Sequence, residues 1–200
     1  MKFDSGIIVP DDRKGLLFDL DGTIVNNMPL HREAWVQLGQ EYGVPITGQM
    51  IDEIAGIPTF QVIELFNQQF GWGIEPHAFT KKKQERYRDL KAAAGKTEVI
   101  QPIMDIIEYY RGKIPMTVGT GSSRDNALLA LNDVGILDYF EIVVTADDVT
   151  NPKPHPEPFL KGAAHIGVAP QDCLVFEDGE MGMKSAIDGG IPYIDIRPFV

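Results

Sequence analysis

Cysteine is nearly absent from this 200-residue chain, and the single Cys173 excludes an intramolecular disulfide. Such cysteine usage is typical of a reducing compartment, so we expect a cytoplasmic protein. Cys173 lies in an apolar run, where a thiol usually serves as a small buried hydrophobic group. No apolar run approaches the roughly 20 residues of a membrane-spanning helix, and no signal-peptide pattern is visible at the N-terminus. We therefore expect no membrane partner.

Basic residues are also scarce, with 18 Lys and Arg against 29 Asp and Glu, a net charge of −11. Nucleic-acid binding needs clustered cations, so we expect no nucleic-acid partner. The one basic run, residues 81–83, lies in a polar helical pattern and is interpreted as a solvated helix face. The hydrophobic share of 44% suits one globular core with a small accessory domain, and we expect a monomer or weak homo-oligomer.

Short apolar runs predict buried parallel strands at residues 15–20, 115–119, 141–145, 173–177 and 192–196. Helical patterns follow in the intervals, at residues 103–110, 123–133, 156–166 and 181–188. Alternation of strand and helix is typical of an α/β fold with a doubly wound, Rossmann-like parallel sheet.

One interval breaks this alternation, because about ninety residues after the first strand contain no convincing strand. Helical patterns fill it at residues 29–42, 49–55, 59–70 and 76–94, with Thr59 expected as the N-cap of the third. The interval is too long for a loop, so we predict an all-helical domain at residues 26–94, inserted into a core of residues 1–25 and 95–200. Such a domain would lie over the crevice as a lid.

Two carboxylates, Asp19 and Asp21, close the first predicted strand just before Gly22. Strand side chains alternate, so both should project to one side, at the edge where open α/β sheets bind ligands. Like charges this close repel unless a cation lies between them, and the expected cation is Mg²⁺. The alternative is structural, since Asp21-Gly22 is also a common turn signal.

The second predicted strand ends in Thr120, Gly121 and Ser122. Hydroxyl groups and free backbone N–H groups at a helix N-terminus suit a phosphate oxygen. Helix capping alone would also explain Ser122, whereas Thr120 still belongs to the strand end.

Lys153 stands between Pro152 and Pro154, and the two prolines restrict the local backbone. A rigidly presented cation suits a site that stabilises a phosphoryl group and the carboxylate that receives it. The alternative is an incidental lysine on a proline-rich surface loop.

Glu177 and Asp178 end another predicted strand, before Gly179. Asp178 could complete an all-oxygen magnesium shell with Asp19, because Mg²⁺ prefers carboxylates, carbonyls and water. A solvated acidic turn is the alternative.

The four motifs follow one another in one order, at or just beyond the ends of successive predicted strands. In this the chain resembles the haloacid dehalogenase superfamily of phosphotransferases, through Asp19-x-Asp21-Gly22-Thr23, Thr120, Lys153 and Glu177-Asp178. The resemblance covers essentially the whole chain, including a helical cap. Within the superfamily the chain looks most like the branch that holds β-phosphoglucomutases and small sugar-phosphate phosphatases, including fructose-1-phosphate phosphatases.

The resemblance implies a role for each motif. Asp19 would be the nucleophile that accepts the phosphoryl group, and Asp21 the general acid and base. Thr120, with Gly121 and Ser122, would bind the phosphate oxygens, and Lys153 would stabilise the aspartyl phosphate. Mg²⁺ would be bound by Asp19, the Asp21 carbonyl and Asp178, with Glu177 joining through water.

Two positions depart from the family pattern, and a third matches it. Asn26 stands where an aspartate is more common, and Thr59 ends a Gly56-x-x-Thr59 loop that in mutases reads Gly-x-x-Arg. In mutases that arginine binds a second phosphate through its positive charge, which a threonine lacks. His31 matches a histidine that helps position the acid/base aspartate in mutases; the alternative is an exposed helix histidine.

The sequence therefore predicts a Mg²⁺-dependent phosphatase of small phosphorylated metabolites, with sugar monophosphates expected. A β-phosphoglucomutase-like enzyme is the alternative, and would need another cation such as Arg124 or a cap lysine. A non-enzymatic alternative is a phospho-accepting receiver domain, which also combines an aspartate, a hydroxyl residue and a lysine on a doubly wound sheet. Receiver domains are uncapped, so the helical insertion argues against it.

Overall fold

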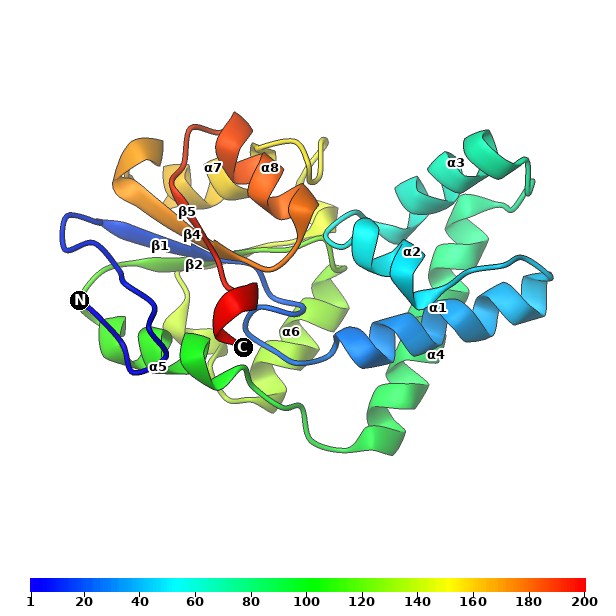
Figure 1. Ribbon diagram of the computed structural model, residues 1–200, viewed down its shortest axis with the longest axis horizontal. Helices are drawn as coiled ribbons and strands as arrows, with labels where there is room; N and C mark the ends of the chain where they lie inside the picture. Colours follow the sequence, from blue (N-terminus) through cyan, green and yellow to red (C-terminus); the bar gives the residue numbers. More distant parts are fainter.

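A five-stranded parallel sheet forms the centre of the larger body in the computed structural model, which describes residues 1–200 (Figure 1). The strand order is β3-β2-β1-β4-β5. The strands are β1 (Gly15–Phe18), β2 (Met116–Gly119), β3 (Ile142–Val144), β4 (Cys173–Glu177) and β5 (Tyr193–Asp195). The predicted doubly wound α/β fold is confirmed.

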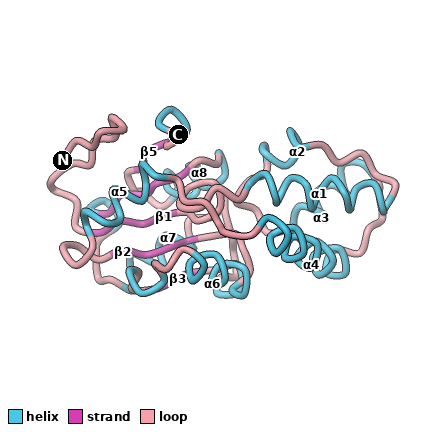
Figure 2. Tube along the Cα trace, turned by 90° about the horizontal axis from the view of Figure 1, so that it is seen from below, coloured by secondary structure: helices cyan, strands magenta, loops and turns pink.

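Helices cover both faces of the sheet, as Figure 2 shows. They are α5 (Gln101–Tyr110), α6 (Arg124–Asp133), α7 (Glu157–His165) and α8 (Glu180–Asp188). Strand alternation decides which face each β1 side chain joins: Leu16 and Phe18 pack with α5 and α6, and Leu17 packs with α7 and α8. Both faces of β1 are therefore buried, as in other parallel sheets.

Four further helices form a second body, which we call the cap: α1 (Met28–Tyr42), α2 (Gly48–Glu53), α3 (Thr59–Phe70) and α4 (Pro76–Ala94). The cap has its own hydrophobic cluster around Trp35, Leu38, Phe66 and Phe79. Figure 1 shows it beyond the carboxyl ends of the strands. From these separate clusters we propose that residues 26–94 form the cap domain and that residues 1–25 and 95–200 form the core domain.

Three local predictions were wrong. Strand β1 ends at Phe18, so Asp19 and Leu20 lie in the loop that follows. Pro58 occupies the N-cap position of α3, and Thr59 is its first helical residue. Lys83 is buried rather than solvated, because helical periodicity places it on one stripe of α4 with Phe79 and Tyr87.

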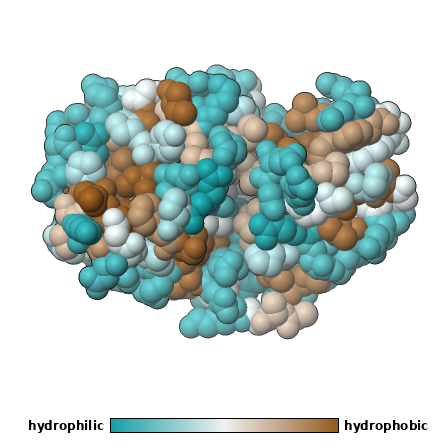
Figure 3. All heavy atoms as spheres, viewed as in Figure 1, coloured by the Kyte–Doolittle hydropathy of each residue, from teal (hydrophilic) through white to brown (hydrophobic).

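Hydrophilic residues cover most of the face shown in Figure 3, over both bodies. No helix reaches the combination of length and apolar character that a membrane crossing requires.

Candidate active site

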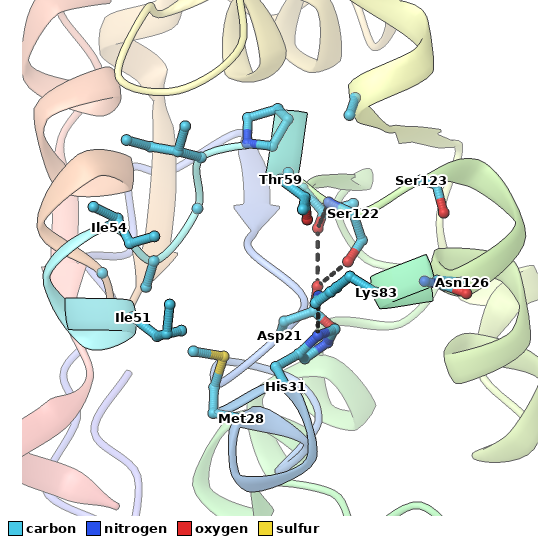
Figure 4. Close-up of a pocket in the computed structure, with 18 of the residues that line it drawn as sticks. Asp21, Met28, His31, Ile51, Ile54, Thr59, Lys83, Ser122, Ser123 and Asn126 are labelled. Carbon is cyan, nitrogen blue, oxygen red and sulfur yellow. Dashed lines mark hydrogen bonds and ion pairs between the residues drawn. The ribbon is translucent and has the colours of Figure 1, made fainter. Parts of the chain in front are cut away.

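A cavity of about 150 Å³ lies between the carboxyl ends of the strands and the cap (Figure 4). Ten of the residues singled out from the sequence line it: Asp19, Asp21, His31, Gly56, Thr59, Thr120, Gly121, Ser122, Glu177 and Asp178. Lys153 does not itself line the cavity, but it donates hydrogen bonds to two residues that do, Asp19 and Glu177. Arg124 does not line the cavity, and its guanidinium pairs with Asp148.

Asp19 directly follows β1 and is buried beside a lysine. Lys153 Nζ, itself fully buried, donates to Asp19 Oδ1 at 2.7 Å and to Glu177 Oε1 at 2.8 Å. Burial and the adjacent Glu177 carboxylate raise the pKa of Asp19 well above its usual range, and Lys153 offsets only part of this. Burial alone would lower the pKa of Lys153, but Asp19 and Glu177 raise it above its ordinary value, so the lysine is charged.

Asp19, Glu177 and Asp178 form an acidic cluster, with one carboxylate oxygen of each lying within 4.8 Å of the others. Glu177 Oε2 accepts from the backbone N–H groups of Asp178 and Gly179 at 2.7 and 2.8 Å, so both Glu177 oxygens are engaged. Burial and the Glu177 charge raise the pKa of Asp178 to about 7. Three carboxylates facing one lysine leave excess negative charge, and hard oxygen donors of this kind fit Mg²⁺.

Asp21 lies in different surroundings, among hydrogen-bond donors (Figure 4). Ser122 Oγ and Asn27 Nδ2 each donate to it at 2.5 Å, and His31 Nε2 and Thr120 Oγ1 lie 3.4 Å from its oxygens. Burial by itself would raise the pKa of Asp21, but the bonds from His31, Ser122 and Asn27 hold it below the usual range. Asp21 is therefore ionised and fixed in orientation.

A chain of contacts from the cap fixes His31, which is buried and not an exposed helix histidine. Lys83 Nζ lies 2.8 Å from His31 Nδ1. Because the ammonium is the donor, Nδ1 accepts and Nε2 carries the proton that faces Asp21. Burial and Lys83 lower the pKa of His31, which keeps the ring neutral.

Lys83, Asn27 and Tyr87 are site residues that the sequence analysis missed. The His31 ring stacks on Tyr87 with centroids 4.0 Å apart, and the Tyr87 hydroxyl accepts from Asn27 Nδ2 at 3.0 Å. The spacing of Phe79, Lys83 and Tyr87 by four residues was the available signal, because it places them on one helix face.

The cap loop meets the loop after β2 through backbone atoms at Gly121. A Cβ atom at Gly121 would overlap the carbonyl oxygen of Gly56, so only glycine allows this approach. Ser122 does not cap α6 with its side chain, since its hydroxyl donates to Asp21. The structure thus brings Thr120, Gly121 and Ser122 to the edge of the cavity that holds Asp21.

The site thus combines a buried carboxylate, a lysine and an acidic cluster at the carboxyl edge of a capped parallel sheet. These groups suit a hydrolase that transfers phosphoryl groups. Residues 16–196 match the haloacid dehalogenase-like hydrolase family. The chain belongs to this family and is one of its phosphatases. Its branch is that of the β-phosphoglucomutases and sugar phosphatases.

Named relatives agree with this assignment. Fructose-1-phosphate phosphatase YqaB of Escherichia coli (strain K12) is 36% identical over 183 residues, which cover 92% of this chain and 96% of that protein. The crystal structure of β-phosphoglucomutase from Clostridium difficile superimposes with a TM-score of 0.77 at 25% identity, over 90% of this chain and 83% of that one. A hydrolase from Pseudomonas syringae shares the fold, with a TM-score of 0.82 at 21% identity over 94% and 89% of the two chains.

Proposed function

We propose that this protein is a Mg²⁺-dependent phosphatase of sugar monophosphates that works through an aspartyl phosphate. The observation that carries the proposal is the pairing of Asp19 with Lys153 beside an acidic cluster, opposite an Asp21 fixed by four neighbouring side chains. Covalent catalysis of this kind divides one difficult transfer into two easier ones.

In the first half-reaction, an Asp19 oxygen attacks phosphorus and the bond between phosphorus and the sugar oxygen breaks. Asp21 is ionised in the free enzyme, so it first takes up a proton from solvent as the bound phosphate dianion raises its pKa, and it then passes this proton to the leaving oxygen. In the second half, Asp21 takes a proton from water as the water oxygen attacks phosphorus. The bond to Asp19 breaks and phosphate leaves. Asp21 then returns its proton to solvent, so both aspartates regain their starting forms.

Asp19, Asp178 and the Asp21 carbonyl are the groups that would hold Mg²⁺. Glu177 would act through water, since its two oxygens already bond to Lys153 and to backbone N–H groups. When bound, the cation neutralises charge on the transferring phosphoryl group. Lys153 supplies a further positive charge at the carboxylate that receives it.

The cations of the cavity favour hydrolysis over phosphoryl transfer between two sugar positions. No arginine lines the cavity, and the one lysine that does, Lys83, is bonded to His31. A mutase must hold a second phosphate, for which a free cation is needed. Thr59 lines the cavity at the position of the mutase arginine and carries no charge. The similarity to a fructose-1-phosphate phosphatase supports the same substrate class.

The test is phosphate release from a panel of sugar monophosphates, including fructose 1-phosphate and β-glucose 1-phosphate, with Mg²⁺ and after chelation. We expect release that depends on Mg²⁺ and is lost in Asp19→Asn. Formation of glucose 6-phosphate from β-glucose 1-phosphate faster than phosphate release would instead establish the mutase alternative. Folded protein without release from any member of the panel would contradict the proposal.

A further inference from the structure

A buried ion pair joins the cap to the sheet body outside the cavity. Lys91, in the last turn of α4, is 7% exposed, and its Nζ donates to Asp133 Oδ2 at 2.5 Å. Asp133 is the last residue of α6. Neither residue lines the cavity, so contact with a substrate does not explain the pair.

Helix stability does not explain the pair either. A carboxylate at the C-terminal end of a helix, the place of Asp133 in α6, is disfavoured by the helix dipole. A buried ammonium loses its hydration, which an apolar side chain at the position of Lys91 would avoid. The other ion pair of α4, Arg86 with Glu41, is more exposed and stays within the cap. A buried pair that crosses between two bodies can instead fix how they pack.

The joint between α4 and the sheet body lies at Gly95, which ends the helix with a φ of 83°. Glycine is the residue that adopts this conformation without strain. Asp133 Oδ2 accepts from Lys91 before the joint and, at 3.1 Å, from the Thr97 hydroxyl after it. Figure 1 shows the chain returning from this end of α4 toward α5 in the sheet body. One carboxylate of the sheet body therefore clamps both sides of the joint.

A single stripe of α4 connects this clamp to the candidate site. The buried residues of the helix follow one another at four-residue spacing: Phe79, Lys83, Tyr87 and Lys91. Lys83 contacts the His31 ring, and Tyr87 stacks on that ring. The clamp lies about 12 Å along the helix axis from Lys83, at 1.5 Å per residue. Because a helix is a rigid element, its anchor decides where this stripe meets His31.

We infer that Lys91 is a positioning residue, whose ion pair with Asp133 fixes the orientation of α4 on the sheet body. This orientation in turn presents His31 to Asp21. The inference rests on the proposed function, in which Asp21 protonates the leaving oxygen, and deepens it. Loss of the clamp would displace the partners of Asp21 slightly, and small displacements of reacting groups lower rates. Asp19 would keep its partners, because they belong to the sheet body.

The experiment compares Lys91→Met with the matched control Lys96→Met, which makes the same change at an exposed position. kcat/KM is measured for the best sugar monophosphate of the panel and for p-nitrophenyl phosphate. Nitrophenolate leaves without protonation, whereas a sugar oxygen needs the proton from Asp21. We expect Lys91→Met to lower kcat/KM about tenfold for the sugar phosphate and less than about twofold for p-nitrophenyl phosphate. Lys96→Met should change neither value.

Asp133→Asn and the double variant assign the effect to the ion pair. Each single change removes the same pair, so the double variant should lose no more activity than the weaker of the two single variants. The ¹⁵N signals of the His31 imidazole give a readout that does not depend on activity. They should shift in Lys91→Met and in Asp133→Asn, and stay in place in Lys96→Met.

A merely structural role would not produce the difference between the two esters. Equal losses on both esters, an unchanged kcat/KM for the sugar phosphate, or unshifted His31 signals would overturn the inference while the phosphatase function stands. Failure of the wild-type protein on every ester would instead overturn the function itself. Thermal unfolding identifies a misfolded variant, and Asp133→Asn, which keeps the size of the side chain, then decides the result.

Discussion

Asp19 and Asp21 stand two positions apart in the chain, yet their surroundings have different origins. The partners of Asp19 come from the sheet body: Lys153 from the loop before α7, and Glu177 from the end of β4. Asp21 instead receives two of its partners, Asn27 and His31, from the entry to the cap and its first helix. The pKa shifts of the two carboxyls are opposite, upward for Asp19 and downward for Asp21.

This difference divides the chemistry between the two bodies. The partners that place Asp19, the proposed nucleophile, belong to the sheet body, so its position does not depend on the cap. The state of Asp21 depends on the cap, because α4 reaches it through Lys83 and His31. Under the proposed mechanism, the placement of the cap is therefore coupled to proton transfer by Asp21 and not to phosphoryl acceptance by Asp19.

The largest expected effect comes from removing the nucleophile. Asp19→Asn should lower kcat at least about 10³-fold, since a nucleophile's loss removes the whole covalent route. The fold should be retained, because asparagine keeps the size of Asp19 and its amide oxygen can still accept from Lys153 Nζ. Phosphate release and denaturant unfolding measure the two results. Asp4→Asn, at an exposed position, is the control, and substantial activity in Asp19→Asn would assign the nucleophile elsewhere.

Lys83→Met tests the side of the comparison that depends on the cap. We expect kcat to fall about 10- to 100-fold, less than the full contribution of about 10²- to 10⁴-fold from general acid–base catalysis, because His31 loses the donor that orients it but Asp21 stays in place. Burial lowers the pKa of Lys83 to about 8, so wild-type kcat should decline as pH rises through this value. The variant should lack that decline in a pH profile.

The exposed Lys81→Met serves as control and should keep the wild-type profile. The folded pKa of Lys83 lies below its unfolded value, so unfolding takes up a proton between pH 8 and that value. Wild-type stability should therefore rise with pH across this range relative to Lys83→Met. If the wild type and Lys83→Met had identical pH profiles of kcat, Lys83 would have no influence on proton transfer by Asp21.

Gly121→Ala tests the contact between the sheet body and the cap, where Gly121 meets the Gly56 carbonyl. The added methyl group would overlap the Gly56 carbonyl, so the cap loop has to shift. We expect kcat/KM for sugar phosphates to fall about tenfold, because small displacements disturb reacting geometry. Gly48→Ala is the matched control, since a Cβ there meets only Arg32 at 3.7 Å. If Gly121→Ala had wild-type kinetics, the close contact between Gly121 and the Gly56 carbonyl would not be needed for turnover.

The smallest effect is expected at Arg124. Its guanidinium pairs with Asp148 and does not line the cavity, so Arg124→Ala should change kcat/KM less than about twofold. The exposed ion pair should alter the free energy of unfolding by less than about 1 kcal/mol. Steady-state kinetics with a sugar monophosphate decide the point, and a loss above tenfold would restore the predicted role of Arg124 in substrate binding.

Much of the fold could be predicted from local pattern. The strands and helices follow from apolar runs and periodicity. Asp19, Thr120 and Asp178 directly follow strands that a parallel sheet brings together, and Lys153 lies in the loop beyond β3. Residues far apart in sequence that meet across the cap could not be predicted so directly. The sequence analysis interpreted Lys83 as part of a solvated charged run, because its buried partner, His31, lies 52 positions away in the chain.

The sequence by itself determined the sheet, the helical insertion and the order in which chemical groups arrive at one edge, because these depend on period and on strand direction. Only the tertiary structure decided how the groups differ once there. Burial, neighbouring charge and hydrogen bonds raise the pKa of Asp19 and lower that of Asp21. These effects act over a few ångströms in space and depend on which side chains the cap and the sheet body bring together, whatever their separation along the chain.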